Sequence, residues 1–435
     1  MTLDLINNMW ILFCGLLVFM MAISVGFLEV GELSERFDNA LLKTTIITGS
    51  SLIFMAFVGF NIAFAPSIGG IIGNPLNNGL FLGMFSSNSG MLSGIYWLTG
   101  SAYSNTFLAT GTFFFFEAAC ASVTLALVSV VVLRKVKLMA FIIYSAVYFM
   151  IIWTIPVSWI WNPTGWLYSL GVRDFAGGLL VHGAAAIAAL GILTQVWREE
   201  KKRGLSESKQ VPINLNRGWL TLSILLLWMG WFGFNPGTEL GLNYSAITIV
   251  LTTFISGSAG LLSTMFFKYL ETRENPGMIY AVNGTLMGLV VITPLAGFVS
   301  VGSALILGII AGPLFIVGEK LLSRAKWFTD PVGVLSVHGV GGLFGILMIG
   351  FFSQNVFASA AGYPTVPNGL LFGGGIAALH QLGLEVFGII VVGIFVFVVS
   401  FIVSALLSKG MHGILAEDST LKAKEQVSST APSTQ

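Results

Sequence analysis

Eleven apolar runs, each long enough to cross a lipid bilayer, occupy most of the 435-residue sequence. A membrane-spanning helix needs about 20 predominantly apolar residues. The stretch 278–318 is too long for one span, and Thr293-Pro294 supplies a natural break within it. We therefore predict an all-α polytopic membrane protein with eleven transmembrane helices. The predicted spans lie near 9–30, 42–64, 106–133, 138–160, 175–196, 218–234, 243–267, 278–294, 296–318, 335–352 and 383–408.

Charged residues are too scarce for a water-facing surface. They make up 9% of the chain, against roughly 25% in an ordinary soluble domain, which excludes a soluble globular fold. The net charge of +1 gives no bulk attraction to nucleic acid, so DNA and RNA partners are not expected. Cys14 and Cys120 fall inside apolar runs and predict neither a disulfide framework nor a cysteine-based metal site.

The few basic residues predict the orientation, because Lys and Arg accumulate in cytoplasmic loops. Of the 20 Lys and Arg residues, all but Arg173 lie in or beside alternate loops. This pattern predicts a cell-membrane protein whose N-terminus lies outside and whose C-terminus lies in the cytoplasm. We expect residues 1–410 to form the membrane domain, and the tail 411–435, which ends in a Ser/Thr-rich segment, to be disordered.

An internal repeat opens the fifth and tenth predicted spans. The segments Asp174–Gly183 and Asp330–Gly339 agree at six of ten positions. Because five helices separate the two copies, the copies enter the membrane from opposite sides. The chain is thus predicted to contain inverted five-helix repeats, spans 1–5 and 6–10, followed by an eleventh helix.

Each repeat copy carries a histidine about eight residues into its apolar helix, His182 and His338. A lone buried histidine is often structural, but two at equivalent mid-membrane positions favour a functional pair. Two imidazoles that share one proton would be neutral, which suits a small polar neutral molecule or a proton relay. With only four histidines in the chain and no carboxylate at ligand spacing, no metal site is expected.

Three further residues are ambiguous from position alone. Asp174, like Asp330, could cap the N-terminus of its helix or attract a cation, and the cap is the preferred interpretation. Trp161 could anchor the chain at the membrane interface or bind a cation with its ring, and the anchor is favoured. Glu117 follows four phenylalanines and must face protein or water; its role stays open.

The sequence resembles the ammonium transporter, methylammonium permease and Rhesus protein family, on its ammonium transporter side, over essentially 9–410. The motifs that carry the resemblance are Asp174–His182, Gly230–Gly237 and Asp330–Gly342. The resemblance implies a homotrimer with one pore per subunit. It also implies ammonium or ammonia as the substrate, with methylammonium as an analogue, and neither a cofactor nor enzymatic activity.

By resemblance, His182 and His338 are similar to the twin histidines that line the family's hydrophobic pore. Phe234 is similar to one ring of the phenylalanine gate above them. Cys120 stands where the second gate phenylalanine is usual, so the resemblance implies a gate with one ring missing, for which another phenylalanine of the 113–116 run could substitute.

For the outer vestibule, the resemblance makes Trp161 the cation-binding tryptophan and reverses the preference for a membrane anchor. Phe116 is similar to its aromatic neighbour, and Asp174 to the buried acid that supports recruitment of the ion. Thr238 stands where many members have a serine, and it keeps the hydroxyl. Glu117 stands where a glutamine is usual.

The expected mechanism follows from the cost of moving a full charge into an apolar pore. Ammonium would be recruited outside, lose its proton before Phe234, and cross as ammonia. An ammonium sensor with little flux and a neutral channel for ammonia or carbon dioxide are the alternatives. The tail retains only a trace of the family's regulatory motif around 413–418, which weakens the case for a PII-type partner.

Overall fold

The computed structural model describes residues 2–33, 35–77, 79–83, 108–132, 134–204, 215–330 and 332–416. These residues are almost entirely helical, with one short two-stranded sheet, β1 paired antiparallel to β2. The first part of the chain contains α1 (Thr2–Leu33), α2 (Phe37–Phe54), η1 (Met55–Gly59), α3 (Phe60–Phe64), β1 (Ser67–Ile68), β2 (Ile72–Gly73), η2 (Leu80–Gly83), α4 (Thr110–Val132), α5 (Leu138–Val147), η4 (Tyr148–Ile152), α6 (Thr154–Ile160), α7 (Trp166–Leu170), η5 (Gly178–Gly183) and α8 (Ala184–Lys202). The second part contains α9 (Arg217–Gly237), α10 (Tyr244–Thr272), α11 (Met278–Ile292), η6 (Thr293–Leu295), α12 (Val301–Leu322), η7 (Val334–Gly339), α13 (Val340–Phe352), α14 (Asn355–Ala360), η8 (Leu370–Phe372) and α15 (Gly375–Gly410).

Within the described residues, eleven helices are long and apolar enough to cross a membrane, which confirms the predicted count. The predicted break near Pro294 is also confirmed. Helix α11 ends at Ile292, one short 3₁₀ turn comes next, and α12 starts at Val301. The main difference in length concerns the last span, which begins at Gly375 and not near residue 383, because the preceding small and polar residues continue the helix.

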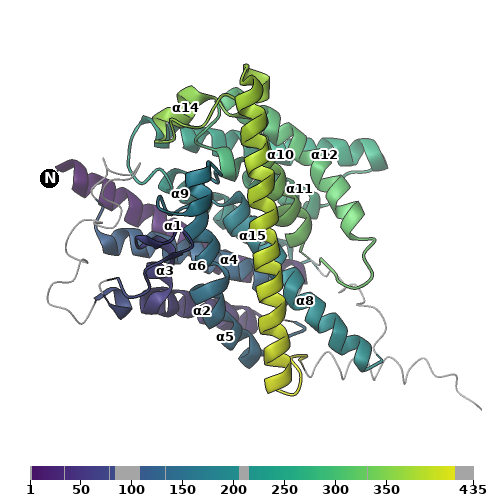
Figure 1. Cartoon of the computed structure of the whole chain (residues 1–435). Helices are drawn as coiled ribbons and strands as arrows, with labels where there is room; N and C mark the ends of the chain where they lie inside the picture. The colour runs from purple at the N-terminus through teal and green to yellow at the C-terminus, as the bar shows by residue number, and fades with distance from the viewer. Residues whose placement is uncertain are drawn as a thin grey trace, which may run out of the picture.

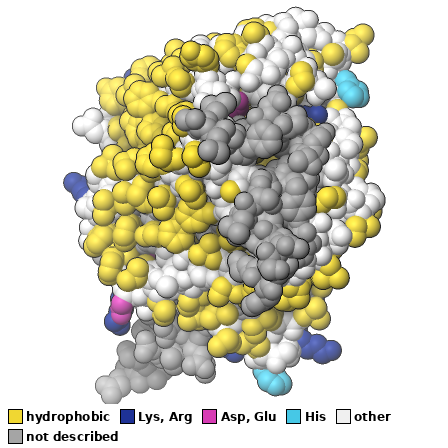
Figure 2. All heavy atoms as spheres, turned by 90° about the vertical axis from the view of Figure 1, so that its left-hand side faces the viewer, with side chains coloured by type: hydrophobic (Ala, Val, Ile, Leu, Met, Phe, Trp, Pro, Cys, Tyr) yellow, Lys and Arg dark blue, Asp and Glu magenta, His cyan; other side chains and the backbone are white. Residues whose placement is uncertain are grey.

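The outer surface is that of a protein surrounded by lipid. Figure 2 shows a face covered largely by hydrophobic side chains, with few charged side chains. Large apolar residues such as Leu262, Ile309 and Ile394 are exposed on the helices. Only a hydrocarbon environment makes such exposure favourable over a broad surface, so the chain is a multi-pass membrane protein.

Helices that are distant in sequence pair closely in the bundle. Helix α1, the first span, packs along α9, the sixth. The η5–α8 segment of the fifth span contacts η7 and α13 of the tenth. This pairing is compatible with the predicted inverted repeat. The long helix α15 crosses the front of the bundle in Figure 1 and packs against α8 and α13.

Small residues allow α10 and α11 to approach closely. A β-carbon added at Gly260 of α10 would lie 2.5 Å from the Gly284 carbonyl oxygen and 2.8 Å from the Gly288 Cα atom, both on α11. The Ser256 hydroxyl also donates a hydrogen bond of 2.7 Å to the Gly288 carbonyl. Membrane helices associate through such small-residue contacts, since lipid and side chains are equally apolar.

The residues after α15 lie against the ends of α4, α5 and α8. The backbone N–H groups of Ile414 and Leu415 donate to the Glu199 carboxylate, and the Lys137 ammonium donates to the Gly413 carbonyl at 2.8 Å. The start of the predicted tail, up to Ala416, is thus held at this end of the bundle. The remainder of the tail, from 417, lies outside the described residues.

We expect Gly260→Ala to destabilise the protein by about 1–3 kcal/mol, because the added methyl group would force α10 away from α11. The thermal unfolding midpoint of the detergent-purified protein measures the effect. Gly49→Ala is the matched control: apart from its own helix, no atom of the described residues lies within 4 Å of a β-carbon there, and we expect less than about 1 kcal/mol. Equal unfolding midpoints for the two variants would contradict this account of the packing.

Candidate functional site

The two repeat copies begin with the same local structure. Gly177 and Gly333 adopt left-handed backbone angles, with φ of 104° and 68°. Each glycine directly precedes a π-helical turn, η5 or η7, which carries its histidine in the last turn. Residues with side chains rarely adopt such angles, so glycine permits the sharp entry into both helices.

A carboxylate satisfies the first N–H groups of each π-helical turn. Asp174 Oδ1 accepts from the N–H groups of Gly177 and Gly178 at 3.0 and 2.7 Å. Its Oδ2 accepts from Leu179 and Leu180 at 2.9 and 2.8 Å. Both oxygens are therefore engaged by the helix start, whose unpaired donors would otherwise be costly inside the protein.

Asp330 occupies the equivalent place before η7. Its Oδ1 accepts from Leu335 N–H at 2.9 Å, and its Oδ2 accepts from both the N–H and the hydroxyl of Ser336 at 2.8 Å. Two carboxylates thus fix two helix starts, and each helix carries one histidine into the protein interior.

The structure brings His182 and His338 into direct contact. Their Nδ1 atoms lie 3.0 Å apart, and their ring planes are inclined by 30° with centroids 5.0 Å apart. Both rings are buried, with 0% and 4% of each residue exposed. The Nε2 atom of His182 is also buried and has no hydrogen-bond partner among the described residues, so it can interact with a small polar molecule.

Helix α9 and the cap residue at its C-terminal end bring three aromatic or polar positions to the site along one face. Trp231 stacks on His182 at 5.4 Å with an 18° angle between the rings. Phe234 lies 5.9 Å from the same imidazole, and Thr238, one turn further, donates its hydroxyl to the Phe234 carbonyl at 3.1 Å. The spacing of three and four residues aligns these side chains on a helix.

A pocket rich in aromatic side chains, here called the aromatic pocket, lies at the end of this face. It gathers five of the residues singled out from the sequence, Phe116, Glu117, Cys120, Trp161 and Thr238. Its full lining comprises Phe64, Phe113, Phe116, Glu117, Cys120, Trp161, Phe175, Thr238 and Leu240. Aromatic faces and a hydroxyl can receive a small cation.

Asp174 touches this pocket only indirectly. The Trp161 indole N–H donates to the Asp174 backbone carbonyl at 2.6 Å, so this residue positions the ring. Burial raises the pKa of the Asp174 carboxyl to about 6, although its four backbone donors oppose the rise. The carboxyl is therefore mainly ionised at pH 7 and contributes negative charge behind the pocket.

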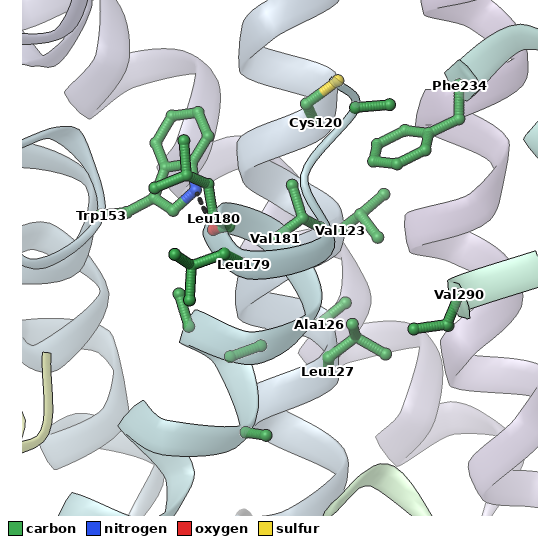
Figure 3. Close-up of a cluster of buried hydrophobic side chains, with 14 of the residues drawn as sticks. Cys120, Val123, Ala126, Leu127, Trp153, Leu179, Leu180, Val181, Phe234 and Val290 are labelled. Atoms are coloured by element: carbon green, nitrogen blue, oxygen red, sulfur yellow. Dashed lines mark hydrogen bonds between the residues drawn. The ribbon is translucent and has the colours of Figure 1, made fainter. Parts of the chain in front are cut away.

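Cys120 and Phe234 lie in one cluster of buried hydrophobic side chains, together with Val123 and Val181 (Figure 3). Cys120 is 2% exposed and Phe234 is 1% exposed. Cys120 also lines the aromatic pocket, and Phe234 contacts His182. The cluster thus lies between the pocket and the two histidines.

Sequence reasoning did not assign a role to Trp231, although its indole covers His182. Its N–H donates to the Thr293 hydroxyl at 3.0 Å, which fixes the ring. The sequence does contain a signal for this role: Trp231 comes three residues before Phe234 and therefore lies on the same helix face. Across the described parts of the chain, no group of three His, Cys, Asp or Glu residues could hold a metal ion.

Comparison with known proteins decides the family. Residues 9–424 match the Ammonium Transporter Family. The chain belongs to this family. An ammonium transporter of Bacillus subtilis is 29% identical over 404 residues, with 92% of each chain covered. A putative ammonium transporter of Synechocystis is 31% identical, with 81% of this chain and 76% of the relative covered.

Solved structures agree with this family assignment. A structure named Sensor Amt Protein superposes with a TM-score of 0.81 at 26% identity, and 99% of each chain is covered. The crystal structure of Saccharomyces cerevisiae Mep2 has a TM-score of 0.74 at 24% identity, with 92% of this chain and 87% of Mep2 covered. At 24% identity, the likeness to Mep2 shows a shared fold alone.

We expect Asp174→Asn to lower the free energy of unfolding by about 3 kcal/mol, because an amide presents a donor where four backbone N–H groups need acceptors. Thermal unfolding in detergent measures the loss. Asp38→Asn serves as the control, since this exposed acid pairs only with Arg36 among the described residues and its loss should cost less than about 1 kcal/mol. An equal loss in both variants would argue against the cap.

Proposed function

We propose that this member of the ammonium transporter family recruits ammonium in the aromatic pocket, releases its proton there to water from the outer side, and passes ammonia along His182 and His338. The observation that carries the proposal is the buried contact of 3.0 Å between the two Nδ1 atoms. It lies beyond a pocket whose aromatic rings and hydroxyl suit a small cation.

Recruitment is supported by the composition of the pocket wall. The faces of Trp161 and Phe116 offer cation–π contacts, and the Thr238 hydroxyl offers an acceptor. The ionised Asp174 carboxylate adds attraction from behind, without a direct contact, because its oxygens accept from backbone groups.

Deprotonation is supported by the apolar region between the pocket and the histidines. The Cys120–Phe234 cluster is buried and apolar (Figure 3), and a bare ion would lose its hydration there without compensation. Ammonia has no such charge. The imidazoles can exchange hydrogen bonds with it, since each neutral ring offers one donor and one acceptor.

The positions of the basic residues support an outward-facing pocket. Helices α4 and α9 reach the pocket with Phe116 and Thr238, whereas their opposite ends lie beside Arg134 and at Arg217. Basic residues mark the cytoplasmic side, so the ends near Arg134 and Arg217 face the cytoplasm, and the end with the aromatic pocket faces the outside of the cell membrane. The C-terminus then faces the cytoplasm. We also propose that the protein is a homotrimer with one pore per subunit. Transport by the proposed mechanism does not require a PII-type partner.

An ammonium sensor is the second candidate, favoured by one observation: the similarity in fold to Sensor Amt Protein extends over 99% of both chains. A sensor and a transporter would share the pocket and the binding of ammonium. They differ in flux, so uptake into vesicles separates them.

We expect the double variant His182→Ala, His338→Ala to reduce methylammonium uptake by reconstituted vesicles at least about tenfold, the effect of roughly 1.4 kcal/mol on the barrier. The lost hydrogen bonds would leave ammonia desolvated in the pore. His380→Ala, an exposed histidine at the start of α15, is the control and should keep normal uptake. Unchanged rate and selectivity in the double variant would refute the pore assignment.

We expect ammonium to evoke a current in the wild type if the released proton crosses by another route, and no current if only neutral gas passes.

Cys120→Phe should reduce uptake severalfold, because a second ring would join Phe234 in the buried cluster and narrow the path. Solid-supported membrane electrophysiology measures the ammonium-evoked current, and methylammonium uptake measured in parallel gives the transport rate. Ile402→Phe on the exposed surface of α15 controls for an added ring; equal effects would contradict a gate at Cys120.

A further inference from the structure

Glu117 places a carboxyl group in the wall of the aromatic pocket. It follows Phe116 on α4 and lies one turn before Cys120. Only 6% of the residue is exposed. Its Oε2 atom is buried without a hydrogen-bond partner, and no ion pair joins it to a cationic side chain in the described part of the chain.

Such a group needs a partner. An acid at this depth is expensive unless a cation or several donors compensate it. The described protein supplies neither to Oε2, whereas four N–H groups surround Asp174. Glu32 and Glu239 also keep one buried oxygen without a partner, but of these three acids only Glu117 lines the aromatic pocket. The contrast indicates that the partner of Glu117 comes from outside the chain.

The neighbours of Glu117 indicate what that partner is. Trp161 and Phe116 present ring systems that attract cations, and Thr238 presents a hydroxyl. Glu117 is the one carboxylate in the lining of this pocket as described. The pocket therefore combines aromatic faces, one hydroxyl and one acid, which together fit a small monovalent cation with N–H donors.

We propose that the Glu117 carboxylate binds the ammonium ion directly in the aromatic pocket, as an ion pair that precedes release of the proton. This inference rests on the proposed function and deepens its recruitment step. It assigns the direct charge recognition to Glu117, while Asp174 fixes the helix and the Trp161 ring and adds attraction only from behind the pocket. A cation that cannot release a proton, such as caesium, should occupy the same place and block it.

Glu117→Gln tests the role, because the amide keeps size and hydrogen bonding but removes the charge. We expect the KM for methylammonium uptake by reconstituted vesicles to rise about tenfold. The inhibition constant of caesium chloride should rise by a similar factor, since one ion pair is lost in both cases. An unchanged KM together with unchanged caesium inhibition would overturn the proposal.

Two variants separate the ion pair from general effects of charge or packing. Glu239→Gln removes an acid that adjoins Thr238 but does not line the pocket and accepts from Asn243 at 2.8 Å; its KM should stay within about twofold of the wild type. Glu117→Asp keeps the charge and should bind more tightly than Glu117→Gln. A rise in KM as large in Glu239→Gln as in Glu117→Gln would refute direct binding.

Binding without flux is measured by titrating the tryptophan fluorescence of the detergent-purified protein with caesium chloride. A wild type that binds caesium but takes up no methylammonium would refute transport, and the titration of Glu117→Gln would still decide the role of Glu117. Should this variant not be monodisperse, Glu117→Thr, which is smaller, neutral and able to bond its own helix, replaces it with the same expected weakening.

Discussion

The contact between the two histidines depends on two carboxylates, the buried one of Asp174 and the partly buried one of Asp330. A helix that starts inside a membrane protein exposes N–H groups that no water can satisfy. Asp174 and Asp330 accept from these groups, so each π-helical turn can begin where the fold needs it and can carry its histidine into the interior. Without these acceptors, the entry of the fifth and tenth spans would be costly, and the rings of His182 and His338 would not be held at 3.0 Å.

Polarity changes in steps along the site. The aromatic pocket combines rings, a hydroxyl and the Glu117 carboxyl, the cluster of Cys120 and Phe234 is apolar, and the histidines again offer hydrogen bonds. In the proposed mechanism, each step selects a different property of the substrate: charge first, loss of charge second, and hydrogen bonding third. Helix α9 orders these steps, because its turns reach all three levels.

The fold was largely predictable because membrane spans follow from length and hydropathy, which are local properties. The break at Pro294 and the pair of capping acids could likewise be predicted from local sequence. The stacking of Trp231 on His182 could not, since it depends on how α9 crosses the fifth span. The same holds for the location of Glu117 in the pocket wall, which requires α4 and α9 to be placed relative to each other. The π-helical turns, too, have no sequence period that distinguishes them.

The Nδ1–Nδ1 contact makes the rings of His182 and His338 chemically unequal. A neutral imidazole has one protonated nitrogen, so one ring must donate across the 3.0 Å gap and the other must accept. The donating ring then has a bare Nε2 atom, and the accepting ring has a protonated one. The pair therefore presents an acceptor at one end and a donor at the other. Reversing this polarity requires two protons to change position, the one between the rings and the one on Nε2, so the pair is directional and has two tautomeric states in which the rings exchange roles.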